Sequence, residues 1–123
     1  MANDTLRNGG DLIAAGLLSP ERQPDIDAVA ARYAVAVTTE VASLIDRADP
    51  DDPVARQYLP SAEELHDAPE ERSDPIGDQR WSPVKGIVHR YPDRVLLMPF
   101  HACAVYCRFC FRRETVGPGG DAL

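Results

Sequence analysis

The stretch RVLLMPFHACAVYCRFCFRRE, residues 94–114, decides which fold is expected for this chain. It begins with a short continuous apolar run, from Arg94 to Phe100. Such a run is typical of a strand that is buried on both faces, as in a parallel α/β sheet. The stretch then holds every cysteine of the protein, which are Cys103, Cys107 and Cys110. The thiols are thus expected just past the C-terminal end of a buried strand, where α/β folds bind their ligands.

The cysteines follow the spacing Cys103-x3-Cys107-x2-Cys110, which puts them on one face of a helix and also lets them converge in a tight loop. An odd number of thiols without an export signal argues against a disulfide framework. Iron–sulfur clusters are commonly held by four cysteines, so three would leave one iron open, as catalytic metal centres do for their substrates. The alternative is a structural zinc site of three cysteines with His101, although four ligands between residues 101 and 110 would be cramped.

The overall composition excludes several classes of protein. A length of 123 residues is enough for one small domain. The net charge of −7 argues against a nucleic-acid binder, because phosphate contacts need a basic surface. No apolar run is long enough to span a bilayer, and the N-terminus lacks the pattern of a secretory signal. We therefore expect a cytoplasmic protein that binds neither nucleic acid nor membrane.

The charge balance reverses locally in the last third of the chain. The arginines concerned are Arg90, Arg94, Arg108, Arg112 and Arg113. A basic cluster in an acidic protein indicates a pocket for a small carboxylate or phosphate. The alternative is that these arginines pair with the surplus acids at the surface.

Residues 1–66 are predicted to form a helical, structural region. Asp52 before Pro53 and Ser61 before Glu64 are typical helix starts, and Thr39 is expected to cap another helix. A solvated face is expected for the acids at and beyond the end of this region, namely Glu63, Glu64, Glu70 and Glu71.

Residues 67–93 are rich in proline but carry large apolar residues such as Ile76, Trp81 and Val84, which are unusual in a free linker. They are predicted to form an extended connector that wraps over a neighbouring surface. Residues 94–123 are predicted to begin with a strand of a parallel α/β sheet, followed by the cysteine loop. Their glycine-rich end, residues 119–123, is expected to be a loop that leads to a helix absent from the chain.

Several motifs resemble a known family. CAVYCRFC (103–110) looks like the cluster motif of the radical S-adenosylmethionine enzymes. The segments DPIGD (74–78), SPVKGIVHRYPDRVLL (82–97) and CRFCFRRETVG (107–117) resemble the lysine 2,3-aminomutase family, and so does the helical opening (11–38). The resemblance covers nearly the whole chain but only the front portion of such an enzyme. It implies an enzyme with a partial TIM-type (β/α) barrel. Residues 94–123 would be the truncated start of that barrel, with its first strand and cluster loop, and residues 1–66 and 67–93 would be the helical region and the connector before it.

The resemblance also implies a set of cofactors. Cys103, Cys107 and Cys110 would bind a [4Fe–4S] cluster whose open iron chelates S-adenosylmethionine. One electron from a reductant protein would release a 5′-deoxyadenosyl radical at the cluster, so no side chain of this chain is assigned a catalytic role. Pyridoxal 5′-phosphate (PLP) would carry the migrating amino group.

The matching positions imply further binding residues. Arg90, Tyr91 and Arg94 would hold the PLP phosphate, and Arg112 would bind the substrate carboxylate, because the planar fork of arginine suits such anions. The alternative is that Arg90 and Arg94 simply pair with the nearby acids, Asp78 or Asp93. Lys85 is expected to be a loop residue, since the family's PLP lysine lies downstream of the cysteines.

The implied activity is that of an isomerase in lysine metabolism, which moves an amino group from C2 to C3 of L-lysine. Glutamate, arginine or a protein-bound lysine are alternative substrates. The complete enzyme, of which this chain would be the front portion, is expected to be a homo-oligomer. A further alternative is a non-catalytic module whose cysteines are a relic. Because most of the barrel is missing, we expect the chain to be an incomplete fragment without full activity.

Overall fold

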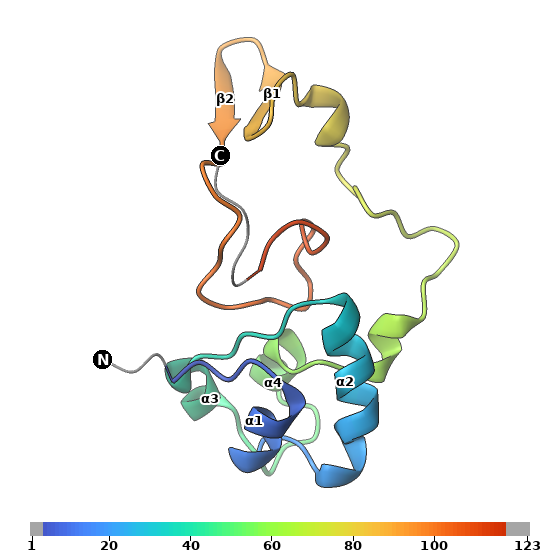
Figure 1. Ribbon diagram of the computed structural model, residues 1–123, viewed down its shortest axis with the longest axis vertical. Helices are drawn as coiled ribbons and strands as arrows, with labels where there is room; N and C mark the ends of the chain where they lie inside the picture. Colours follow the sequence, from blue (N-terminus) through green and yellow to red (C-terminus); the bar gives the residue numbers. More distant parts are fainter. Residues whose placement is uncertain (1–3, 118–123) are drawn as a thin grey trace.

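The computed structural model describes residues 4–117, which form a small, mostly helical structure with one two-stranded antiparallel hairpin. Figure 1 shows the helices gathered at one end and the hairpin at the other. Two segments join these ends, namely the connector and the loop that carries the cysteines. No helix in residues 4–117 is both long enough and apolar enough to cross a membrane.

The helical region is built from short helices, each begun by a local signal. They are α1 (Gly9–Ala14), η1 (Pro20–Arg22), α2 (Gln23–Arg32), α3 (Thr39–Leu44), α4 (Pro53–Tyr58) and η2 (Ala62–Leu65). Asp52 caps α4 by accepting a hydrogen bond from the Ala55 amide at 2.7 Å, and Ser61 forms the predicted capping box with Glu64. Both of these predicted helix starts are confirmed. The side chain that caps α3 is Thr38, not Thr39, which is the first residue of the helix.

The core lies between these helices in two clusters of buried residues. The first contains Leu12, Leu18, Ile26, Val35, Val37 and Ala42. The second contains Val29, Tyr33, Ala36 and Tyr106. Helix α2 serves both, because Ile26 faces the first cluster and Val29 the second. Tyr106 comes from the cysteine-bearing loop, so that loop packs into the core of the helical region.

The hairpin consists of β1 (Ile87–Tyr91) and β2 (Arg94–Leu97), which pair Ile87 with Leu97 and Tyr91 with Arg94. The sequence correctly predicts a strand here, but the expectation of a parallel strand buried on both faces is wrong. All of β2 is exposed, with Val95 at 51% and Leu97 at 59%. The reason is that β2 pairs with its neighbour in sequence across a tight turn, and the sheet in residues 4–117 has no further strand.

The segment 67–93 is less extended than predicted. It contains η3 (Gln79–Trp81) and all of β1. Ile76, Trp81 and Val84 are exposed instead of covering a neighbouring surface, so that expectation is wrong for these three residues. The expected boundary between residues 93 and 94 falls in the turn of the hairpin, and the division into domains stays a prediction. Residues 119–123 lie outside the described part of the chain.

Candidate functional site

The cysteine loop, residues 101–117, has no regular secondary structure and is held in place by backbone hydrogen bonds. The Gly117 amide donates to the His101 carbonyl at 3.0 Å, which closes the loop on itself. The Tyr106 amide donates to the Ala36 carbonyl at 3.0 Å, and the Arg108 amide donates to the Gln57 carbonyl at 2.7 Å. The helical region therefore positions the loop on both sides of Cys107.

Arg108 makes the most buried charged contact of the loop. Its Nε and Nη2 donate to the two carboxylate oxygens of Glu64 at 3.0 and 2.6 Å, and its Nη1 donates to the Ala34 carbonyl at 2.6 Å. The side chains of Arg108 and Glu64 are only 3% and 12% exposed. The expectation that Glu64 belongs to a solvated face is therefore wrong. The same carboxylate completes the capping box of η2, so one residue begins a helix and also holds the loop.

The buried side chain of Tyr106 also holds the cysteine loop in place. Its hydroxyl donates to the Arg113 carbonyl at 2.7 Å, and the Arg108 guanidinium lies 4.9 Å from its ring centroid. Burial raises the pKa of Tyr106 to about 12, against the opposing influence of the Arg108 and Arg113 charges. The phenol is therefore a neutral hydrogen-bond donor throughout the physiological pH range.

The three thiols occupy different environments. Cys103 is exposed, whereas Cys107 and Cys110 are partly buried. Gln57 Nε2 donates to Cys107 Sγ at 3.6 Å, and the Cys110 amide donates to the Cys107 carbonyl at 3.2 Å. Thiolates are the donor set of iron–sulfur clusters, but no group of three Cys, His, Asp or Glu side chains within residues 4–117 is placed to hold a metal ion.

The arrangement therefore does not fit a cluster as it stands, and the ligand role of the three cysteines stays a prediction. The same holds for the alternative zinc set with His101. The Nδ1 atom of His101 is buried and makes no hydrogen bond within the part of the chain that the structure describes.

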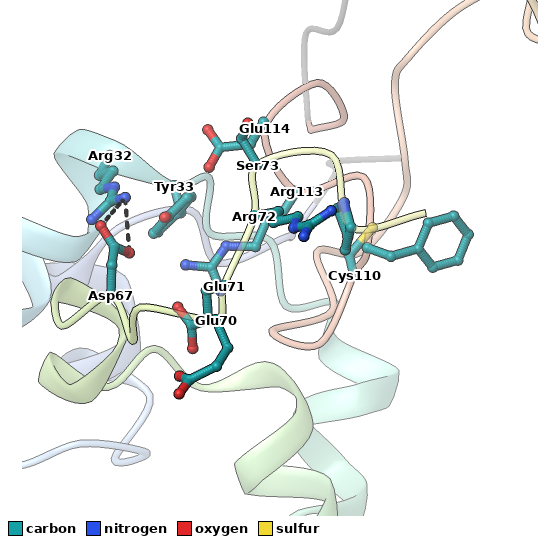
Figure 2. A pocket seen from close by; sticks show the side chains of 12 residues that line it. Arg32, Tyr33, Asp67, Glu70, Glu71, Arg72, Ser73, Cys110, Arg113 and Glu114 are labelled. Carbon is teal, nitrogen blue, oxygen red and sulfur yellow. Dashed lines mark hydrogen bonds and ion pairs between the residues drawn. The ribbon is translucent and has the colours of Figure 1, made fainter. Parts of the chain in front are cut away.

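A hollow of about 630 Å³ opens beside Cys110 (Figure 2). Its walls come from the end of α2, the start of the connector and the cysteine loop. Its charged lining residues are Arg32, Asp67, Glu70, Glu71, Arg72, Arg113 and Glu114. The Arg113 guanidinium lies 3.7 Å from the centroid of the Tyr33 ring, which also lines the hollow. Because its lining carries both carboxylates and guanidinium groups, the hollow suits a small zwitterionic molecule.

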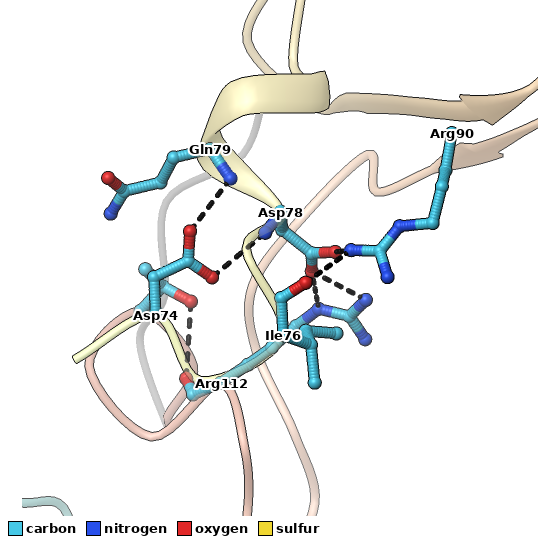
Figure 3. Close-up of polar contacts among 7 residues, drawn as sticks. Asp74, Ile76, Asp78, Gln79, Arg90 and Arg112 are labelled. Atoms are coloured by element: carbon cyan, nitrogen blue, oxygen red, sulfur yellow. Dashed lines mark hydrogen bonds and ion pairs between the residues drawn. The ribbon is translucent and has the colours of Figure 1, made fainter. Parts of the chain in front are cut away.

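A second polar centre lies between η3, β1 and the cysteine loop (Figure 3). Arg90 Nη2 donates to Asp78 Oδ1 at 3.0 Å and to the Ile76 carbonyl at 2.6 Å. Arg112 Nε lies 3.0 Å and its Nη2 lies 2.9 Å from Asp78 Oδ2. Two arginines that the sequence assigns to two different anions thus share a single carboxylate.

Asp74 holds the backbone of this centre in place. Its carboxylate accepts hydrogen bonds from the amides of Asp78 and Gln79, both at 2.9 Å. These bonds, first of all the one from Gln79, hold the pKa of Asp74 below its usual value. Gly77 makes the intervening turn with φ of 70°, a conformation that strains any residue with a Cβ.

The structure divides the three residues predicted to bind the PLP phosphate. Tyr91 and Arg94 form a cross-strand pair, with the Arg94 guanidinium 4.7 Å from the Tyr91 ring centroid. Arg94 also lies 3.8 Å from Asp93 in an exposed ion pair. Arg90 instead contacts Asp78. The alternative pairing with Asp78 and Asp93 is therefore what the structure shows, and the phosphate role of the three residues stays a prediction.

Comparison with known proteins gives consistent relatives, although no family model matches the chain. The L-lysine 2,3-aminomutase of Clostridium subterminale is 41% identical over 106 residues, which are 86% of this chain and 26% of that protein. The L-lysine 2,3-aminomutase of Bacillus subtilis is 43% identical over 84 residues, or 68% of this chain and 18% of that protein. The glutamate 2,3-aminomutase of Clostridioides difficile is 35% identical over 100 residues, or 81% of this chain and 24% of that protein. The chain spans about a quarter of the length of the curated relatives it matches.

Proposed function

This chain belongs to the lysine 2,3-aminomutase family, and on that premise we propose that it supplies the cysteine loop, with the helices that hold it, to a radical S-adenosylmethionine aminomutase. The observation that carries the proposal is the 41% identity over 86% of the chain. The reaction would move an amino group from C2 to C3 of an amino acid. L-Lysine is the first candidate, because most of the matched relatives are named for it.

In this proposal Cys103, Cys107 and Cys110 are the ligands of a [4Fe–4S] cluster. Such a cluster, when bound, supplies the one-electron chemistry that acts on S-adenosylmethionine. Since the described loop does not gather the thiols, the proposal requires the loop to rearrange as metal binds. Metal ligation commonly drives local folding of this kind.

The arginines would bind the anionic groups of the other ligands. Arg112 would hold the substrate carboxylate, and Arg90, Tyr91 and Arg94 would hold the phosphate of PLP. The position of Arg112 supports this proposal, because it lies two residues beyond Cys110 in the sequence and its guanidinium already binds a carboxylate, that of Asp78. A reductant protein, a homo-oligomeric assembly and a cytoplasmic location belong to the same proposal.

Glutamate is the second candidate substrate, because one relative is a glutamate 2,3-aminomutase. The two substrates share the α-amino acid group and differ in the charge of the side chain. An arginine that binds the shared carboxylate does not distinguish them, so side-chain recognition would depend on residues other than Arg112.

Anaerobic reconstitution with iron and sulfide tests the cluster assignment. We expect iron and sulfide to bind in equal amounts, and the reduced protein to give the electron paramagnetic resonance signal of a [4Fe–4S] cluster. Single changes of Cys103, Cys107 or Cys110 to alanine should each abolish that signal. His101→Ala is the control, and it should leave the iron site intact. The zinc site would be favoured if the unmodified chain bound zinc and the His101→Ala variant lost it.

The size of the native product decides how the activity is to be tested. An antibody raised against residues 20–70, applied to cell extract, measures that size. If the band lies near 13.5 kDa, we expect the chain alone to form no β-amino acid from lysine or glutamate. If the band is much heavier, the heavier protein is the one to assay with both substrates by mass spectrometry. Formation of β-lysine by the 123-residue chain alone would contradict the expectation of incomplete activity.

A further inference from the structure

Asp78 brings together three segments that are distant in the sequence. It stands at the start of η3, Arg90 lies 12 residues further on in β1, and Arg112 lies 34 residues further on in the cysteine loop. Figure 3 shows the two guanidinium groups converging on its carboxylate. The contact between Asp78 and Arg112 therefore links the cysteine loop to the hairpin end of the molecule.

The geometry of this contact is that of an oxyanion held between two arginines. One carboxylate oxygen accepts from Arg90 and the other from Arg112, at 2.9 to 3.0 Å. The Asp78 side chain is 16% exposed, so the two charge-assisted bonds are largely shielded from water. Asp74 adds a further negative charge nearby, but its carboxylate is occupied by the backbone amides of Asp78 and Gln79.

We propose that Asp78 is an internal carboxylate ligand that fills the anion site formed by Arg90 and Arg112, and that a phosphate or carboxylate ligand binds these arginines only by displacing it. The link to PLP and substrate rests on the proposed function, which assigns the two arginines to those molecules. Asp78 would keep the two arginines together before a ligand arrives. It would also raise the concentration at which any other anion occupies the site.

Trp81 provides the measurement, because it is the only tryptophan and lies in η3, three residues from Asp78. Inorganic phosphate is titrated into the unmodified chain and into Asp78→Asn while tryptophan fluorescence is followed. We expect Asp78→Asn to bind phosphate at least about tenfold more tightly, a difference of about 1.4 kcal/mol. The double variant Asp78→Asn with Arg112→Gln should lose this gain, because one of the two arginines is then absent.

Asp51→Asn is the matched control, because it removes the same charge from an exposed ion pair with Arg56, an arginine that is assigned to neither anion. Equal phosphate affinities in Asp78→Asn and Asp51→Asn would show a general effect of net charge and would overturn the proposal. Tight phosphate binding that survives in the double variant would also overturn it. A parallel titration with acetate distinguishes the two ligand sources: preference for phosphate points to the cofactor, and preference for acetate to a substrate carboxylate.

A second measurement covers the case in which Asp78→Asn does not fold, as judged by circular dichroism. In the unmodified chain the Nε–H resonance of Arg112 should not move with phosphate in the low millimolar range, because Asp78 occupies that donor. A saturable shift of this resonance at such concentrations would contradict the proposal. Neither experiment needs iron, so failure of this inference leaves the cluster assignment standing, and failure of cluster reconstitution leaves this inference standing.

Discussion

Replacing Glu64 with glutamine tests whether the helical region holds the cysteine loop through Arg108. The change keeps the shape of the side chain but removes the charge that faces a guanidinium only 3% exposed. Breaking a buried ion pair by removing one charge typically costs about 3–5 kcal/mol, because the other charge stays buried without compensation. Domains of this size have unfolding free energies of about 5–15 kcal/mol, so the loss would be a large part of the total.

Urea unfolding followed by circular dichroism measures this cost. With a denaturant dependence of about 1–3 kcal/mol per molar urea, we expect the midpoint of Glu64→Gln to fall by about 2 M. The control is Glu63→Gln, which makes the same change at an exposed neighbour and should shift the midpoint by less than about 0.5 M. A local readout is alkylation of Cys107, which should become faster as the loop leaves the helices.

Two results would refute this reasoning. Equal midpoints for Glu64→Gln and Glu63→Gln would show that the buried ion pair contributes little. A lower midpoint with unchanged alkylation of Cys107 would show that Glu64 stabilises the capping box of η2 and does not hold the loop. A double-mutant cycle with Arg108→Met separates these cases, because only the pairwise contact produces a coupling energy.

Three further outcomes are expected. Burial raises the pKa of Tyr106 to about 12 in the folded chain, so the folded state favours the protonated phenol. The resulting contribution to the free energy of unfolding is complete below pH 10. About 2 kcal/mol of it should be lost as pH rises from 10 to 12. Tyr106→Phe should remove this alkaline dependence in urea titrations. Asp52→Ala should cost about 1 kcal/mol by removing the cap of α4, with Asp51→Ala as the exposed control. Gln57→Ala should speed alkylation of Cys107 without changing that of Cys103, as mass spectrometry would show.

The parts of the fold that sequence reasoning predicted correctly are those set by neighbouring residues. Asp52 before Pro53, and Ser61 three residues before Glu64, begin helices because the capping side chain bonds an amide within the same turn. These signals are complete within four residues. No distant part of the chain is needed to satisfy them, so the sequence alone reveals them.

The errors concern choices that depend on distant segments. The apolar run after Arg94 indicates a strand, but its composition does not say which strand will pair with it. In the structure β1 takes that place across a tight turn, and β2 is left exposed. Similarly, Glu64 looks like one of several surface acids, because its partner Arg108 is 44 residues away. The burial of Arg108, which is what calls for an acidic partner, becomes visible only in the structure.

The cysteine loop is held from two sides, and the two contacts differ in a way that bears on function. Arg108 binds the loop to the helices through a pair that is 3% and 12% exposed, whereas Arg112 binds it to η3 through a pair that is 24% and 16% exposed. Water and small anions reach the second contact more readily, so we expect it to open first. Cys110 lies between these two arginines, at the wall of the hollow. An oxyanion that displaces Asp78 would therefore remove one of the contacts that hold the Cys110 side of the loop, while Arg108 keeps Cys107 against the helices and the Tyr106 hydroxyl keeps its bond to the Arg113 carbonyl.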